Sequence, residues 1–286
     1  MRMRFELTRD AAAFAARAQQ FVEARVERGV LATVLVGALR GYFGEGLFAC
    51  GVDADENVVA AAMRTPPWPM LVSELDDPDA DALVSAWLDH DPDLPGVTGL
   101  ADSARAVAEA WERATGGSWW IDTHEALHVL DELRDPPRPA PGRLREARGE
   151  ERGLLIEWEQ AFVREAARVG DHGERLVDAR LAYRGVYLWD DGGPVCEVGN
   201  APPTAGVVRL GPVYTPPELR GRGYATSAVA ARSRLAIESG LRCTLFTDLA
   251  NPTSNKIYAD VGYRRVADWN ELCFSESPRE RAQRAP

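Results

Sequence analysis

Four prolines fall within six residues near the middle of the 286-residue chain, at Pro136, Pro137, Pro139 and Pro141. Proline lacks the amide hydrogen that a helix interior or a central strand needs, so neither element can continue through this segment. We therefore predict an interdomain linker at residues 136–142, with one domain over residues 1–135 and a second over residues 143–274. The length of 286 residues agrees with two domains, because a domain has about 100–200 residues.

The two parts carry different charge. Residues 1–135 contain 24 acidic and 11 basic residues, a net charge of −13, whereas residues 136–286 contain 20 acidic and 22 basic residues, a net charge of +2. The sum of −11 and a pI near 5.0 argue against nucleic acid or an anionic membrane as a partner. A membrane helix is not expected either, because the longest apolar run, at residues 29–39, is too short.

The four cysteines are far apart and form no CxxC pair, at Cys50, Cys196, Cys243 and Cys273. This spacing favours reduced thiols in a cytoplasmic protein over a disulfide framework or a zinc site.

Periodicity predicts a mixed α/β sheet in the second part. We expect strands at residues 143–147, 186–189, 195–198, 207–215, 243–247, 263–266 and 269–274, with helices at 153–167, 224–239 and 251–261. The polar tail, residues 275–286, is expected to be disordered. In the first part we expect helices at 9–28, 80–88 and 103–114, the last with Asp102 as its N-cap, and extended segments at 58–63, 70–72, 94–97 and 119–133.

One segment of the second part predicts a site for a diphosphate. The strand that ends near Val213, Tyr214 and Thr215 leads into a turn rich in glycine and arginine, and a helix starts directly after it. Glycines allow a tight turn, the free N–H groups of the helix start bind an anion, and arginines supply counter-charge. A Walker loop is excluded, since the only lysine is Lys256. The turn contributes the candidate residues Arg220, Gly221, Arg222, Gly223, Tyr224, Ala225 and Thr226.

A second pattern follows about 30 residues later. Asn251 precedes Pro252, which is typical of a helix start. Asn251, Asn255 and Tyr258 stand at i, i+4 and i+7, so they share one polar face of this helix. Because that face can line a cleft, we count Asn251 and Asn255 among the cofactor-binding candidates.

With both patterns in this order, residues 143–274 resemble the GNAT superfamily of acyl-CoA N-acyltransferases. The resemblance implies the GNAT fold, acetyl-CoA as co-substrate, no metal, and acetyl transfer to a primary amine by direct attack in a ternary complex. It also implies that the strand at Val213–Thr215 receives the thioester, and that Tyr258 protonates the departing thiolate.

Two features of the reaction stay open. The strand at residues 207–214 has no carboxylate, so Glu197, Asp248 and a water chain remain candidates for the general base, which is unassigned. The acceptor amine belongs to a small molecule or to a protein, and a cationic acceptor is expected if the acidic first part lines the cleft. The chain is expected to be a monomer or a homodimer.

The first part is interpreted as a degenerate GNAT-like copy, which makes the fold a tandem. Its phosphate loop is missing where residues 95–100 stand, so we expect an accessory role as a substrate wall or dimer surface. A non-catalytic acyl-CoA-binding regulator is the alternative function.

A zinc metallopeptidase is a second alternative, because His124, Glu125 and His128 form an HExxH motif. The residues before it favour a strand, in which the two imidazoles would stand roughly 13 Å apart, too far for one metal ion.

Overall fold

The computed structural model describes residues 3–165 and 173–275 and divides them into two compact units. Unit 1 contains the described residues up to Ala126 and those from Ala267 onward. Unit 2 contains the described residues of Leu127–Val266. No helix among the described residues is long and apolar enough to span a membrane.

Unit 1 is built on a sheet with the strand order β1-β2-β3-β4-β5-β12. In this sheet β4 and β5 are parallel, whereas the β1–β2, β2–β3, β3–β4 and β5–β12 pairs are antiparallel. Helix α3 makes the crossover between β4 and β5. The elements are β1 (Arg4–Thr8), α1 (Ala11–Glu23), η1 (Val26–Arg28), α2 (Leu31–Leu39), β2 (Leu47–Val52), β3 (Val58–Arg64), β4 (Met70–Val72), α3 (Asp77–Leu88), β5 (Gly96–Leu100), α4 (Ala101–Thr115) and β6 (Ser118–Leu130).

Unit 2 repeats this order of elements, with β6-β11-β10-β9-β8-β7 as the order in its sheet. The parallel pair is now β10–β11, and α7 makes the crossover. The elements are β7 (Arg143–Glu146), η2 (Gly149–Glu151), α5 (Arg152–Glu165), α6 (Gly173–Ala182), β8 (Val186–Asp190), β9 (Pro194–Asn200), β10 (Val207–Tyr214), η3 (Pro217–Leu219), α7 (Tyr224–Glu238), β11 (Arg242–Asp248), α8 (Pro252–Val261) and β12 (Tyr263–Ser275). The repeated order confirms the predicted tandem arrangement.

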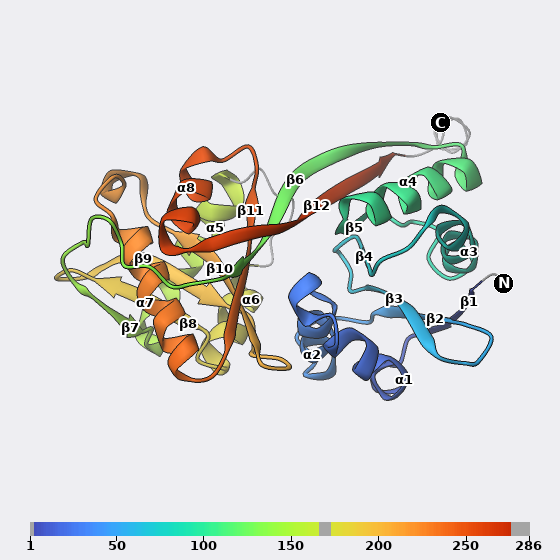
Figure 1. The fold of residues 1–286 in the computed structure, drawn as a ribbon, viewed down its shortest axis with the longest axis horizontal. Coiled ribbons are helices and arrows are strands. Elements are labelled where there is room, and N and C mark those ends of the chain that lie inside the picture. Colours follow the sequence, from blue (N-terminus) through green and yellow to red (C-terminus); the bar gives the residue numbers. More distant parts are fainter. Residues whose placement is uncertain (1–2, 166–172, 276–286) are drawn as a thin grey trace. The chain divides into compact units, whose positions relative to one another are not determined.

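The last strand of each half of the sequence enters the sheet of the other half. Strand β12 starts in unit 2 and pairs with β5 in unit 1, in antiparallel register from Trp269↔Leu100 to Cys273↔Gly96. Strand β6 starts in unit 1 and is the neighbour of β11 in the sheet of unit 2. Figure 1 shows these two long strands side by side, β6 in green and β12 in red.

The predicted division into residues 1–135 and 143–274 therefore differs from the units that the structure forms. Residues 135–142, which we call the proline segment, belong to unit 2. The Ala140 N–H donates to Ser227 Oγ at 2.9 Å, and the Trp189 Nε1–H donates to the Pro141 carbonyl at 2.7 Å. Prolines exclude a helix or central strand, but an extended segment can still lie against other elements and accept hydrogen bonds.

The helix ends in unit 2 follow the predicted residues. Asn251 is the N-cap of α8, Gly262 at φ 106° ends it, and Gly240 at φ 76° follows the end of α7. In unit 1, Asp102 is not the N-cap of α4, because β5 runs directly into the helix and Leu100 takes that position. The strands expected at 263–266 and 269–274 form the single strand β12. The predicted tail after Ser275, and the last residues of the helix expected to end at residue 167, lie outside the described residues.

Two apolar clusters cover the two faces of the unit 2 sheet. One contains Cys196 and Val198 of β9 together with residues of α7 and α8. The other contains Leu188 of β8 and Tyr214 of β10 together with residues of α5 and α6. Because side chains alternate along a strand, Glu197 of β9 faces the α5 and α6 side.

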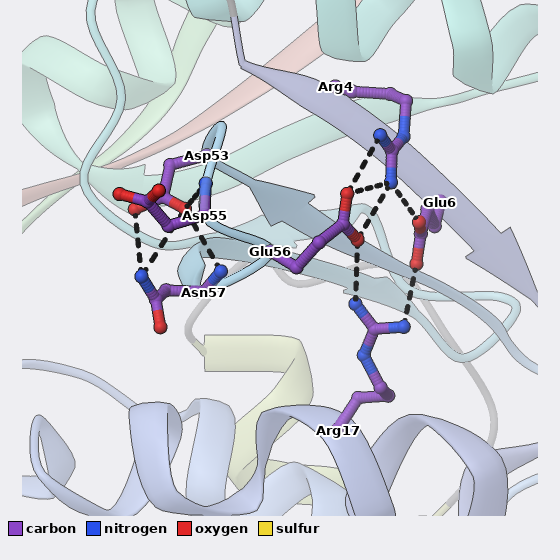
Figure 2. A network of polar contacts seen from close by, with 7 residues as sticks. All are labelled: Arg4, Glu6, Arg17, Asp53, Asp55, Glu56 and Asn57. Carbon is purple, nitrogen blue, oxygen red and sulfur yellow. Dashed lines mark hydrogen bonds and ion pairs between the residues drawn. The ribbon is translucent and has the colours of Figure 1, made fainter.

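A polar network joins α1 to the strands of unit 1 (Figure 2). Arg17 of α1 lies 3.1 Å from Glu6 and 4.0 Å from Glu56, and Arg4 contacts the same two carboxylates. In the turn between β2 and β3, Asp53 Oδ1 accepts from the N–H of Asn57 at 2.9 Å. The network is exposed, so we expect it to orient this hairpin and to add little to stability.

Candidate functional site

Strands β10 and β11 separate before they end. Their parallel pairing runs from Val207↔Arg242 to Leu210↔Leu245. The pairing of β10 with β9 has an irregularity between Leu210 and Val213, after which Val213 pairs with Val198. The ends of β10 and β11 thus leave main-chain groups at Val213, Tyr214 and Thr215 outside the parallel ladder.

Three buried polar atoms without a hydrogen-bond partner belong to the elements around this separation. They are Thr215 Oγ1 after β10, Thr247 Oγ1 in β11 and Asn255 Oδ1 in α8. Leaving a buried polar atom unpaired costs about 1–3 kcal/mol, and a polar ligand would remove that cost. Thr247 was not a sequence candidate, because a single threonine in a strand forms no recognisable motif.

The start of α7 is open to an anion. Its N-cap is Gly223 at φ 82°, preceded by Gly221 at φ 78°, and no side chain caps the helix. The N–H groups of the first turn, at Tyr224, Ala225 and Thr226, have no acceptor within an α-helix by geometry. Together with the helix dipole, they form the anion-binding arrangement that the sequence predicts.

The two arginines of this turn differ in their contacts. Arg220 donates from Nε to the Thr215 carbonyl at 2.8 Å and forms a 2.6 Å ion pair with Glu165 Oε2. The Tyr214 hydroxyl donates to the other oxygen of Glu165 at 3.1 Å. Arg222 contacts the Glu218 carbonyl at 3.2 Å, and no described carboxylate lies within ion-pair distance of it. Glu165, a residue that sequence reasoning missed, thus neutralises one of the two predicted phosphate ligands.

Helix α8 brings its predicted residues to one end of the site. Asn251 uses its side-chain oxygen to cap the helix, accepting from the Ser254 N–H at 3.1 Å. Asn255 donates from Nδ2 to the Asp248 carbonyl at 3.2 Å, which leaves its buried Oδ1 as the unpaired atom. Asn255 therefore has a group to offer a ligand, whereas Asn251 uses its oxygen for the helix.

Tyr258 lies in the apolar cluster on the α7 and α8 side of the sheet. Its ring meets that of Tyr263 edge-on, with 6.0 Å between centroids. Burial is the main cause that raises the pKa of the Tyr258 hydroxyl above its ordinary value, and Cys196 adds to the shift. The hydroxyl therefore stays protonated at neutral pH and can donate a proton.

Glu197 is the buried carboxyl group of the site. It is 1% exposed, and neither of its oxygens has a hydrogen-bond partner. Burial raises the pKa of Glu197 to about 8, with Arg180 opposing the shift and Glu159 adding to it. Arg180 forms a 2.6 Å ion pair with Glu159. The charge of Arg180 is therefore shared between Glu159 and Glu197.

The other candidate base has a structural contact. Asp248 Oδ1 accepts from the Ala250 N–H at 2.8 Å and so holds the turn before α8, and the residue is exposed. A carboxyl group whose pKa lies near neutral pH is better suited to exchange a proton, which favours Glu197.

Glu197 and Tyr258 lie on opposite faces of the same sheet. Glu197 stands opposite Tyr214 in the β9–β10 register and faces α5 and α6, whereas Tyr258 packs on the α7 and α8 side. The separated ends of β10 and β11 belong to the sheet between these faces. A substrate held there would meet a proton acceptor on one side and a proton donor on the other.

The HExxH residues lie in β6, which confirms the predicted strand. His124 Nδ1 is 3.0 Å from Asn270 Oδ1. The described residues contain no group of three or more side chains arranged to hold a metal ion.

In unit 1 the counterpart of the α7 start lies between β4 and α3, and not at residues 95–100 as expected. Both turns follow the first strand of the parallel pair and precede the crossover helix. The counterpart has neither arginine nor glycine, and Asp76 caps α3 by accepting from the Asp79 N–H at 3.1 Å. A cavity of about 670 Å³ at this point is lined by five acidic side chains and one arginine, Arg28, together with apolar and small residues. Arg28 forms a 2.6 Å ion pair with Glu74. The other acidic residues are Asp76, Asp79, Asp102 and Asp268.

Comparison with known proteins agrees with this geometry. Residues 204–273 match the family described as FR47-like protein, and this range includes β10, α7, β11 and α8. No curated protein matches the chain in sequence.

Solved structures match nearly the whole chain in fold. A GCN5-related N-acetyltransferase from Sphaerobacter thermophilus has a TM-score of 0.60 and 18% identity, covering 95% of both chains. A GNAT-family acetyltransferase from Colwellia psychrerythraea has a TM-score of 0.59 and 10% identity over 95% of this chain and 98% of its own. A tandem GNAT protein from the clavulanic acid biosynthesis pathway has a TM-score of 0.58 and 15% identity, with the same coverage. The chain therefore has the tandem GNAT fold.

Proposed function

Starting from this fold, we propose that the chain is an N-acetyltransferase that moves an acetyl group from acetyl-CoA to a primary amine. The observation that carries the proposal is the separation of β10 from β11, with buried unpaired oxygens on Thr215, Thr247 and Asn255 and an uncapped helix start beside them. These groups suit an extended ligand that has amides along its length and a diphosphate at one end.

The residues present fit acetyl-CoA. The N–H groups at the start of α7, together with Arg222, would hold the diphosphate. The unpaired oxygens would accept hydrogen bonds from amides of the pantetheine arm, and a main-chain N–H of residues 213–215 would polarise the thioester carbonyl. When bound, acetyl-CoA supplies the activated acyl group.

Proton transfer is assigned to the two residues on opposite faces of the sheet. Glu197 accepts the proton of the attacking amine, because its pKa of about 8 leaves a minor fraction ionised at pH 7 that grows as the pH approaches 8. Tyr258 donates a proton to the departing thiolate, since its hydroxyl is protonated at neutral pH. This placement separates the incoming nucleophile from the leaving group.

Unit 1 is assigned an accessory role. Its counterpart turn places the Asp76 carboxylate at the helix start, where unit 2 leaves N–H groups free for an anion. The cavity beside it is lined by five carboxylates and a single arginine, and this excess of negative charge would repel a diphosphate. We therefore assign one acyl-CoA site to the chain, in unit 2.

The test measures thiol release from acetyl-CoA in the presence of a panel of primary amines, for wild type and Tyr258→Phe. We expect turnover with at least one amine, and a loss of about 10²-fold in kcat for the variant with little change in acetyl-CoA affinity. Tyr263→Phe is the matched control, because it removes a hydroxyl that is bonded to Ser233, from the ring next to Tyr258. Acetyl-CoA binding without turnover on any amine would favour a regulatory binding protein, and equal rates for Tyr258→Phe and wild type would remove Tyr258 from the reaction.

A further inference from the structure

The proline segment lies along α7 and reaches the start of that helix. Asp135 forms a 2.6 Å ion pair with Arg234 near the end of α7, and the Ala140 N–H bonds to Ser227 in its second turn. Between them, the Arg138 carbonyl lies so close to Gly223 that a Cβ on this glycine would be 3.0 Å from the carbonyl oxygen. The segment therefore brings the backbone of residue 138 to the N-cap of α7.

Arg138 carries an exposed side chain at this point. Within the described residues, no carboxylate lies within ion-pair distance of its guanidinium. Arg220, in contrast, is already paired with Glu165. Of the arginines near the start of α7, Arg138 and Arg222 are thus the ones whose charge is left for an external anion.

We propose that Arg138 binds a phosphate group of coenzyme A, so that the proline segment forms part of the cofactor site. The inference rests on the proposed function, since it adds a residue to the same ligand site. A guanidinium binds phosphate through paired N–H···O contacts, and arginine is well suited to this role because it stays charged at any physiological pH. The motif at residues 220–225 gives no sign of Arg138, which stands more than 80 residues earlier in the chain.

The phosphate could be the diphosphate or the 3′-phosphate of the adenosine end. Arg138 is anchored beside the N-cap of α7, where the diphosphate is expected, but the exposed side chain has the length to extend away from the helix. Ligands that lack one or both of these groups distinguish the two.

The experiment measures equilibrium binding by titration calorimetry of the full chain, for wild type, Arg138→Ala and Arg138→Lys. The ligands are CoA, 3′-dephospho-CoA and S-acetylpantetheine, the last without any phosphate. Arg175→Ala is the matched control, because it removes an exposed arginine from α6, on the opposite face of the sheet. Circular dichroism of each variant establishes that it is folded.

We expect Arg138→Ala to weaken CoA binding about tenfold. The affinity of Arg138→Lys for CoA should lie between those of Arg138→Ala and wild type, and the affinity of Arg175→Ala should equal that of wild type. S-Acetylpantetheine should bind wild type and Arg138→Ala equally. If Arg138→Ala loses as much affinity for 3′-dephospho-CoA as for CoA, Arg138 binds the diphosphate. If it loses affinity for CoA alone, Arg138 binds the 3′-phosphate.

Either of two results overturns the proposal: CoA binding by Arg138→Ala within twofold of wild type, or an equal loss for S-acetylpantetheine. Failure of the proposed function would look different: either wild type itself would bind neither CoA nor its derivatives, or wild type would bind CoA and turn over no amine while Arg138→Ala still weakened that binding.

Discussion

The indole nitrogen of Trp269 donates a 2.7 Å hydrogen bond to Thr98 Oγ1, across 171 positions of sequence. Trp269 is 3% exposed and pairs with Leu100 in the β12–β5 register. A residue near the end of the chain is thus part of the core of unit 1.

Trp269→Ala should destabilise the protein by about 3–5 kcal/mol, because it removes a large buried ring and leaves the Thr98 hydroxyl without this donor. Urea unfolding followed by circular dichroism measures the change. Trp120→Ala is the control, since Trp120 is 49% exposed in β6 of the same unit and should cost much less. Similar midpoints for the two variants would contradict the role of β12 in unit 1.

The rate of acetyl transfer should depend on the ionisation of Glu197. Because the carboxylate form accepts the proton, kcat/KM should rise with pH and level off above about 8. Glu197→Gln should lower kcat/KM by about 10²-fold and remove this inflection. Acceptor amines of different basicity provide the control: an inflection that moves with the amine belongs to the acceptor, and one that stays belongs to the enzyme.

Ionisation of Glu197 should lower the stability of the protein as pH rises, whereas it should raise kcat/KM. The pKa of Glu197 is raised in the folded protein, so its protonated form is favoured there, and the stabilisation is full below the unfolded pKa of about 4.3. It is lost as pH rises from that value to about 8. The unfolding free energy of wild type relative to Glu197→Gln should fall by about 5 kcal/mol across this window. A constant difference from pH 4 to pH 9 would show that Glu197 titrates normally.

Glu165→Gln should strengthen CoA binding, because the carboxylate that pairs with Arg220 would no longer compete with phosphate for the guanidinium. The pair is largely exposed, so we expect a gain of only about threefold in calorimetric titration. Glu157→Gln is the control, an exposed glutamate on the same helix α5. Weaker binding by Glu165→Gln would mean that the ion pair holds Arg220 in the geometry that binds the ligand.

Gly223→Ala should weaken CoA binding about tenfold and lower the stability by about 1–2 kcal/mol. Alanine at this position would have to adopt φ 82°, which is unfavourable for an L-residue. Its methyl group would also lie 3.0 Å from the Arg138 carbonyl oxygen. Gly206→Ala is matched to it, with φ 77° and no atom near the added Cβ, so it should lose similar stability and keep wild-type affinity for CoA. If both alanine variants bind equally, the contact with the proline segment has no part in binding.

Local patterns predicted those parts of the fold that local chemistry decides. Asn251 with Pro252 fixes the start of α8, and Gly262 fixes its end, because each residue type favours the backbone conformation found there. In unit 1 the same reasoning missed α2, although Leu31–Leu39 is within the longest apolar run of the sequence. An apolar run without caps gives no periodic contrast between faces, so it does not distinguish a buried helix from a strand.

The candidate site shows the same limit. The glycines and arginines before α7 form a motif because they are consecutive, whereas Thr247, Glu165 and Arg138 come to the site from other elements. No local sequence pattern indicates that β6 and β12 each enter the sheet of the other half. The pairing of Trp269 with Leu100 depends on the fold of both halves. The prolines correctly exclude a helix or a central strand from the proline segment, but they do not make it a boundary: the segment belongs to unit 2 and bonds to α7 and β8.

The exchanged strands also bear on how the chain is made. A ribosome releases residues from the N-terminus onward, so β1 to β5 emerge long before β12, and the edge of β5 that pairs with β12 has no partner until β12 has been synthesised. An unpaired strand edge is a site for association with other chains. The nascent first half therefore depends on β12 for its final sheet, and a message truncated at codon 267 would yield a product that contains every residue of unit 2 but only an incomplete unit 1.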